Sequence, residues 1–257
     1  MKVSDFQTFL ASASPASPSL PLAHTTKGRA FQEMLRSEIL IPTFCPVMGE
    51  NRLYFFLGLP SYKYGDPKVQ NISKSSAPIC ILLERSALGH NNVSYPFDSG
   101  CIERAKAEFS LDKDFEKNDY CVTGNNSGPE LLLGAIYENV ENYFSAVPST
   151  NRRNLINGLD FQTQALFELL SSNSSNMIDE RITSIEVQSL TSIPLSLDTV
   201  MALVVPDIVA HEKDFIDLAH LWKADIVEYP WRRTSHTQRG TQIADQAFSY
   251  YKKRGVL

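Results

Sequence analysis

Two groups of short apolar segments, separated by a long stretch with helical patterning, constrain the fold of this chain most strongly. The first group covers residues 22–26, 52–57 and 78–84, and the second covers residues 184–190, 199–206 and 225–229. Each segment has the length and the flanking turn-forming residues of a β-strand. Strands at both ends of a chain with helices between them are typical of an α+β domain. We therefore predict a sheet that is split around a central helical insertion.

The long middle stretch is predicted to be helical because its apolar residues recur at helical spacing. The expected helices there cover residues 101–109, 128–147 and 152–171, and shorter ones cover residues 27–37, 213–223 and 241–254. Residues 11–22 are rich in serine, proline and alanine, which favours an extended arm. A chain of 257 residues is within the reach of one hydrophobic core. We therefore predict one domain over residues 1–257, with an N-terminal arm at 1–21 and the helical insertion at 101–183.

Charge and motif content argue against several classes of protein. The net charge is −5 at pH 7, which argues against a chain dominated by contacts to nucleic-acid phosphates. No apolar run approaches the length of a membrane span, and the first residues lack the apolar core of a secretory signal. The histidines and cysteines show no metal-ligand spacing, and no P-loop, GxGxxG, GxSxG or HExxH motif occurs. We therefore expect a cytoplasmic protein with no membrane segment and no metal.

Polar side chains at three separate places could carry chemistry. His24 and Thr25 lie at the end of the first predicted strand, where the structural alternative is an N-cap threonine beside a surface histidine. Tyr62 and Tyr64 lie in a Gly/Pro-bounded loop after an aromatic strand, where they could stack on a flat ring or pack as an ordinary lid. Glu186 lies in the middle of the strand at 184–190.

The strand at 184–190 alternates apolar and polar residues. Its pattern predicts that Ile185 and Val187 face inward and that Glu186 and Gln188 face outward. A carboxylate in the middle of a strand needs a reason if that face is covered, whereas on an exposed face it needs none.

Taken in order, these segments resemble the His-Tyr-Glu branch of the ADP-ribosyltransferases, which includes diphtheria-toxin-like enzymes and the poly-ADP-ribose polymerases. In that branch a His-x-Thr/Ser sequence ends the first strand, a tyrosine follows an aromatic second strand, and a glutamate lies late on a sheet strand. The similar segments here are residues 24–26, 39–42, 53–62 and 184–188. The resemblance implies a split, antiparallel-rich sheet of ADP-ribosyltransferase type.

The resemblance also implies a function, an NAD-dependent ADP-ribosyltransferase or NAD glycohydrolase. Glu186 would be the catalytic residue, bonding the ribose 2′-hydroxyl and stabilising the positive charge that develops as nicotinamide leaves. His24 would hydrogen-bond the ribose, and Tyr62 or Tyr64 would stack on nicotinamide. The residues implied to bind NAD are His24, Thr25, Tyr54, Tyr62 and Tyr64. His24, Tyr62 and Glu186 are then expected to line one concave site.

The sequence also suggests a biological role, and it leaves two alternative functions open. Residues 57–62 are similar to a loop of uncharacterised bacterial proteins, which implies a toxin or an effector of phage defence. One alternative is a non-catalytic module that binds a nucleotide or a protein on the same fold. The other is a metal-independent nuclease that uses Asp98, Glu103 and the basic C-terminal segment.

The C-terminal segment is basic, although the rest of the chain is acidic. Residues 231–239 are predicted to form a loop in which an aromatic ring and planar cations could meet a phosphate and a base. The side chains of this predicted nucleic-acid contact are Trp231, Arg232, Arg233 and Arg239. Lys252, Lys253 and Arg254 end a predicted helix, where positive charge complements the helix dipole without a partner.

Overall fold

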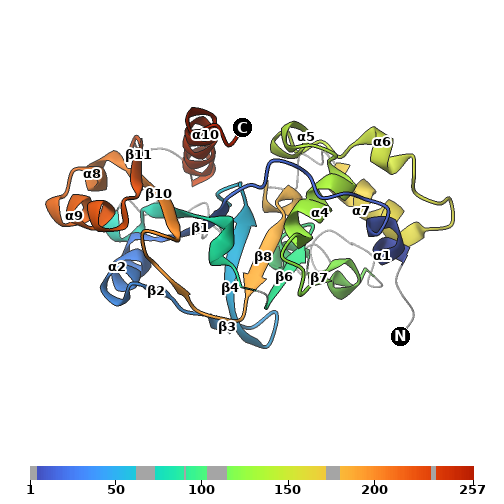
Figure 1. The fold of residues 1–257 in the computed structure, drawn as a ribbon, viewed down its shortest axis with the longest axis horizontal. Coiled ribbons are helices and arrows are strands. Elements are labelled where there is room, and N and C mark those ends of the chain that lie inside the picture. The colour runs from blue at the N-terminus through green and yellow to red at the C-terminus, as the bar shows by residue number, and fades with distance from the viewer. Residues whose placement is uncertain (1–4, 62–72, 90, 103–114, 172–179, 233–235) are drawn as a thin grey trace. The chain divides into compact units, whose positions relative to one another are not determined.

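The computed structural model describes residues 5–61, 73–89, 91–102, 115–171, 180–232 and 236–257 (Figure 1). Its contacts divide the chain into two compact units. Unit 1 comprises Met1–Ser19, Cys45–Glu50 and His90–Gln188, and unit 2 comprises Leu20–Phe44, Asn51–Gly89 and Ser189–Leu257. The predicted helical insertion at 101–183 falls inside the long segment of unit 1, and the single-domain assignment stays a prediction.

Unit 2 is built on a mostly antiparallel sheet with the strand order β11-β10-β5-β1-β4. The bounds are β1 Leu22–Lys27, β4 Glu50–Leu57, β5 Pro78–Leu83, β10 Val200–Pro206 and β11 Asp225–Tyr229. All neighbours pair antiparallel except β10 and β11, which are parallel. All six residues of β5 are buried, as expected for an apolar strand inside the sheet. The prediction of a mixed α and β fold with an antiparallel-rich sheet is confirmed at this level.

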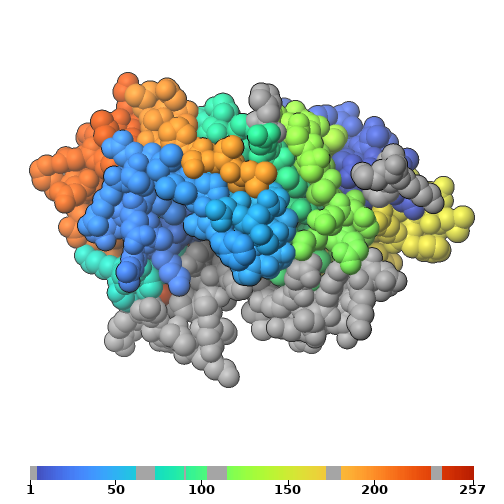
Figure 2. Space-filling model, turned by 90° about the horizontal axis from the view of Figure 1, so that it is seen from below, coloured from blue at the N-terminus to red at the C-terminus, as the bar shows by residue number. Residues whose placement is uncertain are grey.

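Four helices accompany this sheet in the described part of unit 2. They are α2 Gly28–Ser37, α8 Asp207–Ala210, α9 Lys213–Trp222 and α10 His236–Arg254. Helices α2 and α9 each end at a residue in the left-handed conformation, Glu38 and Lys223. The short strands β2 Ile39–Leu40 and β9 Ile193–Pro194 pair antiparallel, so segments far apart in the sequence lie side by side (Figure 2). Strand β3 covers Thr43–Cys45.

Unit 1 combines short strands with helices. Its strands are β6 Asn92–Tyr95, β7 Val122–Thr123 and β8 Glu186–Ser189, and β6 pairs antiparallel with β7. Its helices are α1 Asp5–Leu10, α4 Gly128–Ile136, α5 Val140–Phe144, α6 Thr150–Arg153 and α7 Phe161–Ser171. The core is aromatic: the ring of Phe6 lies 5.3 Å from that of Tyr120 between centroids, and Phe9 meets Phe167 edge-on at 5.9 Å. No helix in the described part of either unit is long and apolar enough to cross a membrane.

The two long helices predicted in the middle of the chain are wrong in their extent. The stretch 128–147 breaks after α4, because Glu138 has a φ of 72° and Asn139 caps a new helix by accepting the Asn142 N–H at 2.8 Å. The stretch 152–171 breaks after α6, because α7 has its own cap, the Asp160 carboxylate, which accepts the Thr163 N–H at 2.8 Å. Local capping side chains therefore override the continuous apolar spacing.

The N-terminal segment contains a helix that the sequence analysis did not predict. Helix α1 buries Phe6, Phe9 and Leu10. After it, the segment lies along α4, since the Ala16 N–H donates to the Glu130 carbonyl at 2.9 Å and the Ser19 hydroxyl donates to the Glu130 carboxylate at 2.6 Å. The residues predicted as an arm are thus attached to unit 1 by both packing and hydrogen bonds.

Replacing Gly134 with alanine is expected to destabilise unit 1 by roughly 1–3 kcal/mol, the usual cost of overpacking. A Cβ atom at Gly134 would lie 2.1 Å from the backbone carbonyl oxygen of Ser14, so one of the two segments must move. Gly158→Ala is the matched control, because a Cβ atom there meets nothing within 4 Å. Urea unfolding of both variants checks the prediction, and equal stability of the two would contradict the close packing of this segment on α4.

Candidate functional site

Glu186 is a buried carboxyl group on the first residue of β8. Its side chain is 2% exposed, and all four residues of β8 are buried. The prediction that Glu186 and Gln188 face outward is therefore wrong. The alternation of apolar and polar residues predicted one covered face, but the start of the helix at residues 99–102 covers the other face as well. Burial is the condition under which a carboxylate in a strand requires a reason.

Three donors converge on the Glu186 carboxyl group. The Ser99 hydroxyl donates to Oε1 at 2.8 Å, and the Ser99 N–H donates to Oε2 at 3.3 Å. The Gln188 amide donates to Oε1 at 2.5 Å and to the Ser99 hydroxyl at 3.2 Å. Gln188 is fully buried, and its Oε1 atom accepts no hydrogen bond from any residue that the structure describes. The cluster therefore holds Glu186 in one orientation, and the Gln188 Oε1 atom can still accept a hydrogen bond.

A buried ion pair lies beside this cluster. Arg181 Nη1 is 2.8 Å from Asp98 Oδ2, and the two side chains are 11% and 7% exposed. The Cys101 N–H donates to Asp98 Oδ1 at 2.8 Å, and the Asp98 N–H donates to the Arg181 carbonyl at 3.3 Å. Asp98, named as a nuclease residue in the alternative interpretation, is thus engaged by a cation and a backbone donor; Glu103 lies outside the described residues.

The environment of Glu186 changes its protonation. The pKa of Glu186 is raised to about 8, mainly by burial and further by the Asp98 charge, while the hydrogen bonds from Gln188 and Ser99 lower it and so oppose both effects. Burial has the largest effect, because it disfavours the charged form of a carboxyl group. Glu186 therefore holds a proton at neutral pH and loses it in the mildly alkaline range, which is the kind of perturbation common at functional sites.

His24 lies in β1 of unit 2 and has a defined tautomer. Its Nδ1 atom is 2.8 Å from the carbonyl oxygen of Tyr54. A carbonyl oxygen only accepts, so Nδ1 carries the hydrogen and Nε2 keeps its lone pair. Nε2 is buried and has no hydrogen-bond partner among the residues described. Burial also lowers the pKa of His24, so the ring is neutral and presents one open acceptor.

The neighbours of His24 settle the structural alternatives for this segment. Thr26 is not the N-cap of α2, because Lys27 occupies that position without a side-chain cap. Thr25 is half-buried and lies opposite Cys80 in the β1–β5 register. Burial raises the pKa of the Cys80 thiol to about 12, so this thiol is not a nucleophile at neutral pH. His24 Nε2 is then a buried acceptor of this segment without a partner among the described residues.

His24 is expected to be the neutral Nδ1–H tautomer at pH 7, and its lowered pKa makes stability depend on pH. His24 takes up a proton at about pH 6.5 in the unfolded chain, whereas in the folded chain it takes up the proton at lower pH. The His24 contribution is therefore fully present above 6.5 and is lost as the pH falls below it. Nitrogen chemical shifts of a labelled His24 ring test the tautomer, and a ring charged at pH 7 would contradict it.

The loop predicted at residues 231–239 does not extend to Arg239. Arg239 belongs to helix α10, is 3% exposed, and lies with its guanidinium 4.3 Å from the centre of the Trp231 ring. Arg232 is exposed and pairs with Asp207 at 3.4 Å. The loop prediction was wrong for Arg239 because the helix begins at His236, earlier than the sequence suggested. Arg233 lies outside the described residues.

The tyrosines predicted to bind NAD are described only in part. Tyr62 and Tyr64 lie outside the described residues. Tyr54 is half-buried in β4, where its carbonyl oxygen binds His24. His24 belongs to unit 2 and Glu186 to unit 1, and the convergence of these residues stays a prediction.

Two residues of the Glu186 cluster were not predicted as site residues. Gln188 carried a usable signal, since residues two apart in a strand share a face. Ser99 carried no such signal, because it contacts Glu186 only through tertiary folding.

Within the described ranges, no group of three or more histidine, cysteine, aspartate or glutamate side chains could hold a metal ion. Comparison of the chain with protein-family models, curated proteins and solved structures finds no match.

Proposed function

We propose that this chain is an NAD-dependent ADP-ribosyltransferase or NAD glycohydrolase in which Glu186 is the catalytic carboxylate. The observation that supports it most is the buried Glu186 cluster, in which a strand carboxyl group with a raised pKa is held by Ser99 and Gln188. Burying a carboxyl group costs stability, so its presence needs an explanation. Carboxyl groups with strongly perturbed pKa values are common in active sites. The open Nε2 acceptor of His24 supports the same proposal.

The proposed reaction breaks the bond between the ribose C1′ atom and the nicotinamide nitrogen. The bonding electron pair leaves with nicotinamide, so positive charge develops on the ribose. The ionised Glu186 carboxylate accepts the ribose 2′-hydroxyl hydrogen bond and stabilises this charge. Water, or a nucleophile on an acceptor, then bonds to C1′ and releases a proton. His24 Nε2 accepts a hydrogen bond from a ribose hydroxyl, which fixes the sugar. In a cell, this activity would suit a toxin or an effector of phage defence.

The activity is expected to rise with pH, because only the ionised form of Glu186 can stabilise a cation. With a pKa of about 8, about one tenth of the molecules carry the charge at pH 7. The rate of nicotinamide release should therefore increase roughly tenfold per pH unit below the pKa and level off above it. A pH profile of kcat/KM checks this prediction, and a flat profile between pH 6 and about pH 8 would contradict the role of Glu186.

A second function is favoured by one specific observation. Glu186 is 2% exposed and protonated at neutral pH, which suits a module that binds a nucleotide or a protein without catalysis. Incubation with NAD at alkaline pH distinguishes the two. Released nicotinamide supports the enzyme, and NAD binding without release supports the module. The absence of both NAD binding and nicotinamide release would contradict the enzyme and a module that binds NAD.

A further inference from the structure

Large apolar side chains gather on the surface of unit 1 where α6 is joined to α7. Leu155, Leu159 and Phe161 are 62%, 78% and 69% exposed. Scattered apolar residues are normal on a protein surface, but three within seven positions of one connection are not. The proposed NAD chemistry uses none of them. They therefore need a separate explanation.

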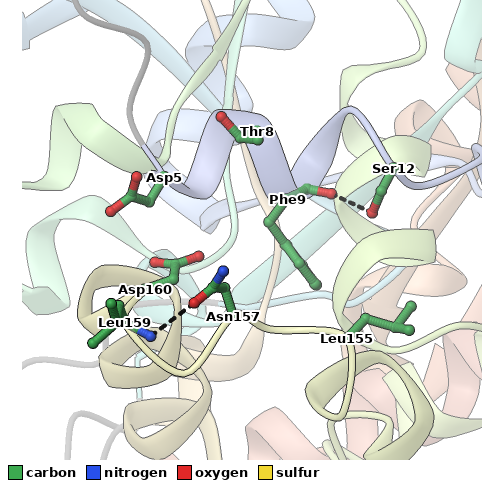
Figure 3. Close-up of a pocket in the computed structure, with 8 residues that line it drawn as sticks. All are labelled: Asp5, Thr8, Phe9, Ser12, Leu155, Asn157, Leu159 and Asp160. Atoms are coloured by element: carbon green, nitrogen blue, oxygen red, sulfur yellow. Dashed lines mark hydrogen bonds between the residues drawn. The ribbon is translucent and has the colours of Figure 1, made fainter.

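Two of these leucines line a groove of about 500 Å³ in unit 1. One side of the groove is a face of α1 and the turn after it, and the other side is the connection from α6 to α7. The lining residues are Asp5, Thr8, Phe9, Ser12, Leu155, Asn157, Leu159 and Asp160 (Figure 3). We name it the α1 groove.

Fixed contacts hold the walls of the α1 groove. On the α1 side, Phe9 packs edge-on against Phe167, and the Arg152 guanidinium lies 5.2 Å from the centre of the Phe9 ring. On the other side, the Asn157 side chain accepts the Leu159 N–H at 2.9 Å, and its carbonyl accepts the Gln164 amide at 3.1 Å. The connection is therefore built to present its leucines outward, and they do not collapse onto unit 1.

The α1 groove has an acidic end. Asp5 and Asp160 lie together at one end, whereas Ser12 and Leu155 lie at the other (Figure 3). Asp5 is exposed, and no basic side chain in the described part of the chain forms an ion pair with Asp5 or Asp160. Asp160 is 8% exposed and uses Oδ1 to cap α7, so Asp5 is the carboxylate of this end that is open to a partner. Carboxylate charge beside exposed leucines favours an occupant that is both apolar and cationic.

We propose that the α1 groove docks a protein partner through an amphipathic segment. Two apolar side chains of that segment pack on Leu155 and Leu159, and a lysine or arginine pairs with Asp5. The carboxylates disfavour an anionic lipid surface at this site. They also disfavour a second copy of this chain, whose net charge is −5. This inference is independent of the proposed NAD chemistry.

Fluorescence anisotropy with two labelled peptides tests the proposal on the full chain. Both probes are amphipathic helices of about four turns with leucines on one face; the other face carries lysines in one probe and glutamates in its twin. The variants are Leu155→Ser/Leu159→Ser and Asp5→Asn, all at exposed positions. Leu221→Ser is the matched control, because Leu221 is 60% exposed on α9 of unit 2.

The lysine peptide is expected to bind more tightly than the glutamate peptide. The double serine variant should weaken its binding about tenfold or more. Asp5→Asn should weaken it roughly two- to fivefold at low salt, and Leu221→Ser should leave it unchanged. No binding, equal binding of both peptides, or binding that survives the double variant would overturn the proposal. It would also be overturned if the double variant dissociated a dimer in sedimentation or abolished binding to anionic phosphatidylglycerol vesicles.

Discussion

Glutamine in place of Glu186 is expected to lower nicotinamide release from NAD by about 10²–10³-fold and to make the folded protein more stable at neutral pH, because the variant no longer keeps protonated a carboxyl group that ionises in the unfolded chain. At neutral pH the folded protein holds Glu186 protonated, so glutamine replaces one neutral group with another of the same shape. The glutamine Oε1 atom can still accept the hydrogen bonds from Ser99 and Gln188. What it lacks is the charge that forms when Glu186 ionises, and that charge acts only in the transition state.

The matched control for this variant is Glu228→Gln, on a half-exposed carboxylate of β11. A second measurement tests the environment of Glu186 without NAD. The folded protein keeps a proton on Glu186 that the unfolded chain loses at about pH 4.5. The contribution of Glu186 to stability should therefore be fully present below pH 4.5 and fall as the pH rises to about 8. Glu186→Gln should remove this slope, while Glu228→Gln keeps it. A variant with full activity would show that the Glu186 charge is not used, and an unfolded one would show that Glu186 is structural.

Arg181→Met is expected to destabilise the protein by about 3–5 kcal/mol, the largest effect on stability that we predict. The variant leaves the Asp98 carboxylate buried without the guanidinium that lies 2.8 Å away. Urea unfolding measures the loss. A change below about 1 kcal/mol would contradict a buried pair, since that is the range of exposed ion pairs.

The double variant Asp98→Asn/Arg181→Met is expected to recover most of that stability. Asparagine keeps the Oδ1 acceptor for the Cys101 N–H and removes the uncompensated charge. The Asp98 charge also raises the pKa of Glu186, so the rising limb of nicotinamide release should move to lower pH in the double variant. An unchanged limb would show that Asp98 does not act on Glu186.

The positions of six strands were predictable from the sequence, because each is an apolar or alternating segment between turn formers, whereas the short strands β3, β6 and β7 were not predicted. The segment predicted at 225–229 is β11, and the one at 78–84 is β5 with one residue fewer. Helix ends were less predictable. The caps at Asn139 and Asp160 interrupt apolar spacing that continues across them, and spacing alone cannot show where a side chain bonds the backbone.

The candidate site was predictable only in its residue types. Glu186 and His24 stood out by position, but periodicity could not show that both faces of β8 are covered. The partners of Glu186 come from Ser99, which is 87 positions away, and from Gln188 on the same strand. A hydrogen bond between such distant residues depends on the tertiary fold, so one sequence cannot reveal it. The burial of Arg239 against Trp231 was hidden for the same reason.

A crystal structure of the protein with bound NAD tests most directly the claim that Glu186 and His24 act on one ribose. We expect a Glu186 carboxylate oxygen and His24 Nε2 both to lie within about 3.2 Å of hydroxyl groups on the nicotinamide ribose. NAD bound elsewhere, or a ribose reached by only one of the two side chains, would contradict this claim.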